Sequence, residues 1–283
     1  MNAEAALFRR LKDGSGRFSR NQRVLAKYVL ARYQTVAFST ITELAGQSGV
    51  SEATIVRFAK ALDFSGYPAF QKEIRRLVRA DLKGTERFKL APKGPDQSPL
   101  NIIIEKELEN ISALRESFDA KAFKKALQVI RGASEVLVAG ARSTASLASH
   151  FWFGLNKLAF KATRVLSITT ETYDHINGLD KRACVLLIGF PRYLREQVEL
   201  LEVVKSRKLA TVTITDSAFS PLQGDVSLYA PAESASFVAF HSAPLILSNA
   251  LLHELSVADQ GKTLEALNRF EAMAESREYF HKG

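Results

Sequence analysis

Two cations and a small methyl group lie together on one short predicted helix near the start of the chain. The apolar residues of the stretch SEATIVRFAKAL (51–62) repeat at the spacing of a single buried helical stripe. At about 100° per residue, Ala53, Arg57 and Lys60 lie within roughly 40° of the opposite direction. One interpretation is a solvated surface, and the other is a helix that lies against nucleic acid.

The side chains of this helix suit contacts with double-stranded DNA. Arg57 can reach a guanine edge or a phosphate, and Ala53 can contact a thymine methyl group. Lys60 is better suited to a phosphate, which carries no sequence information. Hydroxyl groups at the starts of this helix and the preceding one complete the expected set of contacts, namely Ser51, Thr54, Ser39 and Thr40.

A second helix and a glycine turn precede it, so the stretch ITELAGQSGVSEATIVRFAK (41–60) predicts a helix-turn-helix. Thr40 and Glu43 have the spacing of a capping box at the start of the first helix. Gly49 can adopt the positive φ of a sharp turn, and Ser51 can cap the second helix. Small units of this kind also occur as packing modules, so the pattern alone leaves DNA binding as one of two interpretations.

The distribution of charge favours the DNA interpretation. The chain of 283 residues has a formal net charge of +9. Residues 1–89 contain 17 Lys and Arg and 8 Asp and Glu, whereas residues 90–283 contain 22 of each. The whole excess therefore lies in the first third of the chain, as expected for a surface that binds a polyanion.

A second group of polar residues could bind a small anion. In AGARSTASLA (139–148) a predicted strand runs into a predicted helix, and Gly140 allows a tight turn. The side chains that follow, Arg142, Ser143 and Thr144, lie beside N–H groups at the start of that helix. The stretch lacks a G-x-G-x-x-G pattern, so we expect no dinucleotide site and no cofactor. Simple turn chemistry is the alternative explanation of these residues.

Two further loops follow predicted strands and belong to the same candidate anion site. GFPRYLREQ (189–197) offers Arg192, Tyr193 and Arg195, and an Arg side chain can hold a phosphate or carboxylate through two hydrogen bonds. Thr170 stands in the hydroxyl-rich stretch SITTETYDH (167–175). The alternative for the arginine-containing loop is a helix start with solvated charges.

The elements that must position these residues fall into two domains. We expect a DNA-binding helical domain over residues 1–82, a linker rich in Gly and Pro over 83–100, and an α/β domain over 101–283. Five apolar strand-like runs, at 135–140, 164–169, 184–189, 210–215 and 226–231, mostly alternate with helical segments. This alternation predicts a five-stranded parallel sheet covered on both faces. Two helices, roughly 235–257 and 262–280, are expected to end the chain.

The composition of the chain bears on its cellular location and on whether it binds a metal. No apolar run is long enough to cross a bilayer and the N-terminus lacks a signal-peptide pattern, so we expect a cytoplasmic protein without a membrane partner. The single cysteine, Cys184, lies in an apolar run and is expected to be a buried, inert thiol. The five histidines show no metal-ligand spacing, and we expect no metal.

One stretch closely resembles the N-terminal domain of the RpiR-type bacterial transcriptional regulators, namely FSTITELAGQSGVSEATIVRFAKALDFSGYPAFQKEIRRLV (38–78). The resemblance implies a C-terminal sugar isomerase (SIS) domain, a five-stranded parallel, flavodoxin-like module that binds phosphosugars. The loop at 139–148 is similar to the first phosphosugar loop of SIS domains. The loop at 189–197 departs from the family, because the usual S-x-S-G-x-T pattern is absent there.

Two functions from different classes follow. The first is a DNA-binding regulator that is switched by a small anionic effector such as a phosphosugar or sugar acid. We expect this regulator to be a homodimer or a homotetramer. The second is a sugar-phosphate isomerase with an accessory basic domain, which would need a positioned base. Candidates for that base are Glu171, His175, Glu233 and His241, but no pair has a diagnostic spacing. We therefore expect the regulator, with no catalytic residues.

Overall fold

A computed structural model describes residues 11, 18–81, 85, 98–234, 236, 238 and 241–281 of the chain. The chain divides into two compact units, Met1–Leu90 and Ala91–Gly283. Most of the expected linker, 83–100, lies outside the described residues. Each unit is considered by itself below.

The first unit is helical and is built around one aromatic centre. Its described helices are α2 (Arg20–Val36), α3 (Ile41–Ser48), α4 (Glu52–Ala61) and α5 (Tyr67–Asp81). The Phe58 ring of α4 lies 5.2 Å from the ring of Phe18 and 5.8 Å from that of Phe70, measured between centroids. Apolar side chains from all four helices are fully buried in this unit, including Leu25, Val29, Leu44, Ile55 and Ile74.

Local sequence signals place the ends of these helices. The capping box of Thr40 and Glu43 is present, and so is an equivalent box formed by Ser19 and Gln22 at the start of α2. Gly49 ends α3 with a φ of 71°, a left-handed conformation that suits glycine. The expected positive φ at Gly49 and the expected capping box of Thr40 and Glu43 are therefore confirmed.

The second unit contains a five-stranded sheet in which every strand pair is parallel. Its strands are β1 (Val136–Ala139), β2 (Ala162–Val165), β3 (Cys184–Ile188), β4 (Ala210–Thr215) and β5 (Val226–Tyr229). Their order is β2-β1-β3-β4-β5, which is the flavodoxin-like order. The expected fold class is confirmed. Cys184 lies in the central strand β3, where burial raises the pKa of its thiol to about 12.

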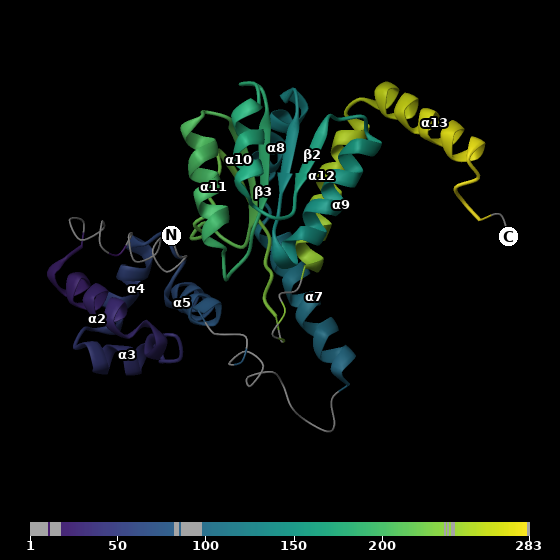
Figure 1. Cartoon of the computed structure of the whole chain (residues 1–283). Coiled ribbons are helices and arrows are strands. Elements are labelled where there is room, and N and C mark those ends of the chain that lie inside the picture. Colours follow the sequence, from purple (N-terminus) through teal and green to yellow (C-terminus); the bar gives the residue numbers. More distant parts are fainter. Residues whose placement is uncertain are drawn as a thin grey trace. The chain divides into compact units, whose positions relative to one another are not determined.

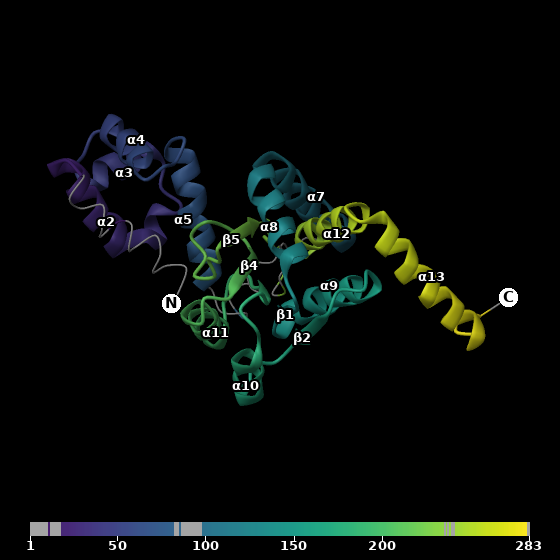
Figure 2. The same ribbon diagram turned by 90° about the horizontal axis from the view of Figure 1, so that it is seen from above.

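Helices cover both faces of the sheet (Figure 1). On one face lie α7 (Pro99–Ser117), α8 (Ala120–Gly132), α9 (Ala145–Lys157) and α12 (Ser242–Val257), and their apolar side chains share a core with β1 residues Val136 and Val138. On the other lie α10 (Thr170–Gly178) and α11 (Arg195–Ser206), which pack against Leu137 and Ala139. Helix α13 (Gln260–Ser276) extends away from the sheet (Figure 2).

One expected helix begins later than the sequence pattern indicated. The helix expected over 235–257 starts at Ser242, and the described residues 236, 238 and 241 are not helical. Pro244 explains this start, because proline lacks an N–H group and is tolerated only in the first turn of a helix. No helix in the described part of the chain is long and apolar enough to span a membrane.

Candidate functional sites

The first candidate site is the outer face of α4. Gly49 turns the chain between α3 and α4, and the Ser51 hydroxyl accepts a hydrogen bond from the Thr54 backbone N–H at 3.3 Å to cap α4. The apolar stripe that contains Ile55 and Phe58 is buried against α2 and α5. That burial leaves the opposite face of α4 to solvent.

The structure places the small methyl group and the two cations on that solvent face. Ala53, Arg57 and Lys60 are all exposed. Arg57 Nη2 donates to Thr54 Oγ1 at 3.3 Å, which holds the guanidinium near the start of α4. Thr54 itself is only 5% exposed, so its buried hydroxyl group positions the exposed Arg57 side chain through this hydrogen bond. The arrangement has the form of a DNA recognition helix, in which N-terminal side chains face the base edges.

Ser39 and Thr40, the expected phosphate contacts before α3, have partners inside the protein. Ser39 is 4% exposed, its hydroxyl donates to the Thr35 carbonyl, and its own carbonyl accepts from Tyr67 Oη at 2.6 Å. Thr40 is exposed, but its backbone N–H donates to a Glu43 carboxylate oxygen at 2.7 Å. The hydrogen bonds that Thr40 donates to Glu43 lower the pKa of the Glu43 carboxyl group and keep a negative charge at the start of α3. Both residues therefore have partners inside the protein, and their contact with phosphate stays a prediction.

The second candidate site lies at the ends of β1 and β3. The order of the strands reverses between these two neighbours, and ligands of open α/β sheets bind in the crevice at such a point. Thr144 links the two loops, because its hydroxyl donates to the carbonyls of Ala141 and Ile188 at 2.9 and 3.1 Å. A Cβ atom at Gly140 would lie 2.7 Å from the Thr144 carbonyl oxygen, so glycine permits α9 to approach β1 closely.

One arginine in each of these loops has a left-handed backbone. Arg142 has a φ of 55° and Arg192 a φ of 68°, and both side chains are exposed. This conformation is unfavourable for a residue with a Cβ atom and is often found at functional positions. Two cations thus stand at the carboxyl ends of adjacent strands, where a phosphate or carboxylate could be held.

The remaining residues expected to bind the effector differ in their exposure and in their partners. Ser143 and Thr170 are exposed, and Thr170 begins α10. Tyr193 Oη donates to Asp216 Oδ1 and so connects the loop after β3 to the end of β4. Arg195 is exposed and forms an ion pair with Glu199 at 2.6 Å along α11. The loops after β1, β2 and β3 all lie at the same edge of the sheet, as the parallel strands require.

A cavity of about 370 Å³ lies between the first turns of α9 and α12. The His241 ring borders it, and its Nε2 atom is buried and has no hydrogen-bond partner among the described residues. Burial lowers the pKa of His241, although the carboxylate of Glu107 opposes the shift. The cavity lining consists of Ser146, Leu147, His150, His241, Ser242 and Leu245.

The other side chains considered as catalytic bases lie on separate elements, and two of them have charged partners. Glu171 is exposed on the first turn of α10. His175 faces Glu135 at 3.5 Å, and Glu233 forms an ion pair with Lys106 at 3.1 Å. The three side chains therefore have separate surroundings.

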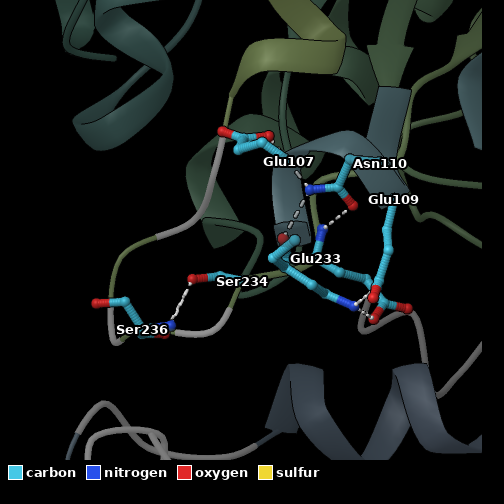
Figure 3. A network of polar contacts seen from close by, with 7 residues as sticks. Glu107, Glu109, Asn110, Glu233, Ser234 and Ser236 are labelled. Atoms are coloured by element: carbon cyan, nitrogen blue, oxygen red, sulfur yellow. Dashed lines mark hydrogen bonds and ion pairs between the residues drawn. The ribbon is translucent and has the colours of Figure 1, made fainter. Parts of the chain in front are cut away.

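A polar network on α7 was missed by the sequence analysis (Figure 3). Asn110 is 3% exposed, and its amide both donates to the Glu233 carbonyl at 2.8 Å and accepts from the Glu233 backbone N–H at 3.1 Å. Glu107 accepts hydrogen bonds from the Ser242 hydroxyl at 2.7 Å and from its backbone N–H at 3.4 Å. No local pattern could have indicated these contacts, because the partners are more than 120 residues apart.

Family models match both parts of the chain. A model of the helix-turn-helix domain of the rpiR family matches residues 6–78, and a model of the SIS domain matches residues 129–254. The chain is 26% identical over 215 residues to the HTH-type transcriptional regulator HexR of Escherichia coli, with 74% of this chain and 72% of HexR covered. An uncharacterised HTH-type regulator of Bacillus subtilis, YbbH, is also 26% identical, over 218 residues, and the match covers 74% of each chain.

Solved structures show the same folds. The sugar isomerase domain of an RpiR transcription factor from Sphaerobacter thermophilus aligns with a TM-score of 0.60 at 23% identity, covering 62% of this chain and 99% of that one. The Vibrio vulnificus NanR protein, solved in complex with ManNAc-6P, aligns with a TM-score of 0.59 at 18% identity and covers 95% of this chain and 98% of its own. The fold similarity thus extends over both units.

Proposed function

Because the chain belongs to the RpiR-type helix-turn-helix regulators that carry a SIS domain, we propose that it binds operator DNA and is switched by a small anionic effector in the SIS domain. The effector is a phosphosugar or a sugar acid. The observation that carries the proposal is the exposed face of α4, where Ala53, Arg57 and Lys60 stand on a buried apolar stripe.

On the DNA side, α4 enters the major groove. Arg57 reads a guanine edge, Ala53 contacts a thymine methyl group, and Lys60 neutralises a phosphate. Ser51 lies at the exposed start of the same helix and belongs to the proposed contact set. Thr54 orients Arg57 through its hydroxyl. Each phosphate contact steepens the dependence of binding on salt concentration.

On the effector side, the anionic group lies at the ends of β1 and β3. Gly140, Ser143 and Thr144 shape the first loop, and Arg142 and Arg192 supply the positive charge. Thr170, Tyr193 and Arg195 border the same edge of the sheet. The phosphosugar in the NanR complex supports this class of ligand, and the arginines replace the serines that the usual SIS pattern would supply.

The switch is a shift between conformations. The effector prefers one arrangement of the tethered DNA-binding units, so its binding changes their affinity for paired operator half-sites. We propose a homodimer or homotetramer, because a single helix-turn-helix reads few bases and two half-sites restore affinity.

We propose that the chain is not an isomerase and uses no cofactor. Glu233, one candidate base, is held by Lys106, and its backbone is held by Asn110. The alternative function has a direct test with the purified full chain. Turnover of a sugar phosphate that disappears with Glu233→Gln would establish an enzyme and contradict the proposal.

The proposal is tested by selecting bound fragments of genomic DNA with the full chain. Affinity is then measured by fluorescence anisotropy between 50 and 200 mM salt. We expect one preferred sequence, a steep loss of affinity with salt, and a shift in affinity when a phosphosugar is added. A chain that ignores all DNA at low ionic strength would contradict the regulatory function.

A further inference from the structure

The loop after β3, which carries Arg192, contacts the residue that precedes α12. Phe190 in this loop is 6% exposed, and its ring centroid lies 5.8 Å from that of His241. Phe190 also shares a buried apolar core with Ala243 in the first turn of α12. Protein interiors are close-packed, so buried side chains in contact move together. A shift of this loop on binding an anion would therefore be transmitted to the start of α12.

Helix α7 holds the start of α12 and the loop after β5 through two side chains on one helical turn (Figure 3). Glu107 Oε1 accepts from the Ser242 hydroxyl at 2.7 Å and from its backbone N–H at 3.4 Å. Three residues further along α7, Asn110 is paired with both backbone polar groups of Glu233, at 2.8 and 3.1 Å. Two attachments on one turn restrict both sliding and rotation of α7, which a single hydrogen bond would permit.

These attachments are strong enough for α7 to follow the elements that it holds. Asn110 is 3% exposed, so breaking its contacts would leave buried polar groups without partners. Its amide also donates to Glu107 Oε2 at 3.4 Å, which joins the two attachments into one network. The Lys106 ammonium adds an ion pair with the Glu233 carboxylate at 3.1 Å, and both side chains are mostly buried. Movement of the start of α12 therefore displaces α7 more readily than it breaks the network.

The other end of α7 leads to the DNA-binding unit along the chain. Helix α7 begins at Pro99 and is the first described helix of the second unit, whereas the first unit ends at Leu90. A displacement of α7 therefore displaces the point from which the connection to the DNA-binding unit starts. Helix shifts of about 1–2 Å are a common means of communication between sites in regulatory proteins.

We propose that α7 transmits effector binding to the DNA-binding unit, and that Glu107 is the positioning residue that links α7 to the start of α12. This inference rests on the proposed function, which puts the anion at the loop of Arg192. The bound anion favours one position of this loop, of α12 and of α7, and the operator favours one position of the DNA-binding units. Glu107 itself contacts neither ligand, so its contribution is to the coupling between them.

The test measures how strongly a probe changes the affinity of the full chain for the selected operator. The probes are N-acetylmannosamine 6-phosphate, glucose 6-phosphate and 6-phosphogluconate. Fluorescence anisotropy gives the operator Kd with and without probe, and the ratio of the two is the coupling factor. Isothermal titration calorimetry gives the Kd of the probe for the free chain. We expect a coupling factor of about 5–150 in the wild type for at least one probe.

Glu107→Ala should reduce this coupling factor to about 1, while each ligand alone binds within about threefold of the wild type. Ser242→Ala removes the donor on the other side of the contact and should lose most of the coupling as well. The double variant should lose no more than Glu107→Ala alone, because both substitutions remove the same contact. Glu107→Gln retains an Oε1 acceptor for the Ser242 hydroxyl and should keep most of the coupling.

Glu105→Ala is the matched control, because Glu105 is an exposed carboxylate on the same helix and lies outside the network. It should respond to each probe as the wild type does. Thermal unfolding followed by circular dichroism establishes that each variant is folded. If Glu107→Ala does not fold, Ser242→Ala decides the outcome, because it retains the backbone N–H bond to Glu107.

The possible results separate the two proposals. If no probe changes operator affinity in the wild type, the effector class under the proposed function is wrong, and this inference is wrong with it. If the wild type responds and both Glu107→Ala and Ser242→Ala respond equally, this inference alone is wrong. Loss of probe binding in Glu107→Ala would place Glu107 in the effector site, and loss of operator binding without probe would give it a role in the DNA-binding state itself. Either result would contradict the inference.

Discussion

Individual side chains divide into those that face outward and those that support them. Arg57 is exposed, and Thr54 beneath it is buried and accepts its hydrogen bond. In the second unit, Arg192 is exposed on a left-handed backbone, and its neighbour Tyr193 is tied to Asp216. The Arg57 guanidinium is thus held by Thr54, and the loop that carries Arg192 is held through Tyr193.

Replacing Arg57 separates base recognition from phosphate contact. Arg57→Ala should weaken binding to the selected operator by about 1–3 kcal/mol and relax the preference at one base pair. Lys60→Ala should weaken binding to all sequences alike and reduce the slope of log K against log salt by about 1. Anisotropy titrations over a set of single-base operator variants measure both effects. Uniform weakening by Arg57→Ala would make Arg57 a phosphate contact instead.

A charge-matched control accompanies these variants. Arg269→Ala removes one exposed positive charge from α13, in the neutral part of the chain. It should leave both operator preference and salt slope as they are in the wild type.

Replacing Arg192 tests the anion site and the strain of its backbone together. Arg192→Ala should remove the response of DNA binding to effector while leaving the affinity for DNA unchanged. Arg192→Gly should do the same. Its free energy of unfolding should be about 0.5–1 kcal/mol higher than that of Arg192→Ala, because glycine accepts a φ of 68° more readily. Chemical denaturation and effector titrations measure the two effects. An unchanged effector response in both variants would exclude this loop from the site.

At the scale of elements, helix ends carry much of the organisation. Ser51 caps α4 and also lies on its exposed face, so it contributes both to the helix and to the proposed DNA surface. The Glu107 carboxylate of α7 accepts hydrogen bonds from Ser242 at the start of α12, although Glu107 and Ser242 are far apart in sequence. Asn110, one turn further along α7, holds the backbone of the loop after β5 (Figure 3).

Variants of Ser51 distinguish the cap from the DNA contact. Ser51→Ala should reduce the free energy of unfolding of the first unit by about 1 kcal/mol, because the Thr54 N–H loses its acceptor. Ser51→Asp should keep the cap and the stability, but its carboxylate should repel DNA phosphates and weaken binding several-fold. Thermal unfolding and anisotropy provide the two measurements. If Ser51→Asp bound DNA as tightly as the wild type, Ser51 would lie outside the interface.

Removing the amide of Asn110 should destabilise the second unit. Asn110→Ala leaves the backbone N–H and carbonyl of Glu233 without their partner in a buried setting, at a cost of about 1–3 kcal/mol. Asn156→Ala is the control, because Asn156 is exposed on α9 and donates to the Trp152 carbonyl in its own helix. Urea unfolding compares the two. Equal stability of both variants would show that solvent replaces the Asn110 contacts.

At the scale of the whole molecule, an apolar stripe on α7 remains uncovered within the described chain. Leu100, Ile104 and Leu108 recur every four residues and are 64%, 45% and 57% exposed. Exposed apolar patches of this kind usually mark contact surfaces. A regulator with paired DNA-binding units needs such a surface, and we expect a second copy of the chain to cover this one.

Placing a charge in the stripe should prevent that assembly. Leu108→Glu should shift the full chain from dimer or tetramer toward monomer in sedimentation velocity. It should also lower the affinity for a paired operator whose half-sites are about 34 Å apart, while a single half-site binds as before. Val24→Glu, at an exposed apolar position of α2, should leave the oligomeric state unchanged. A wild-type monomer at micromolar concentration would contradict the paired arrangement.

Local chemistry in the sequence determined several of the helix ends and the order of the elements along the chain. The capping residues Thr40 and Ser51, the turn at Gly49 and the five apolar strand runs act over a few residues, so their outcome is visible in the sequence itself. The same holds for the helical period that turns Ala53, Arg57 and Lys60 away from the buried stripe of α4.

Only the tertiary structure decided which of these residues reach solvent and which side chains meet. Ser39 and Thr54 have the polarity of contact residues, but packing against α5 and within α4 buries them. His241 lies beside Phe190, and Ser242 meets Glu107, because the chain crosses the sheet several times between them. Such contacts depend on the topology of the whole unit and leave no local pattern in the sequence.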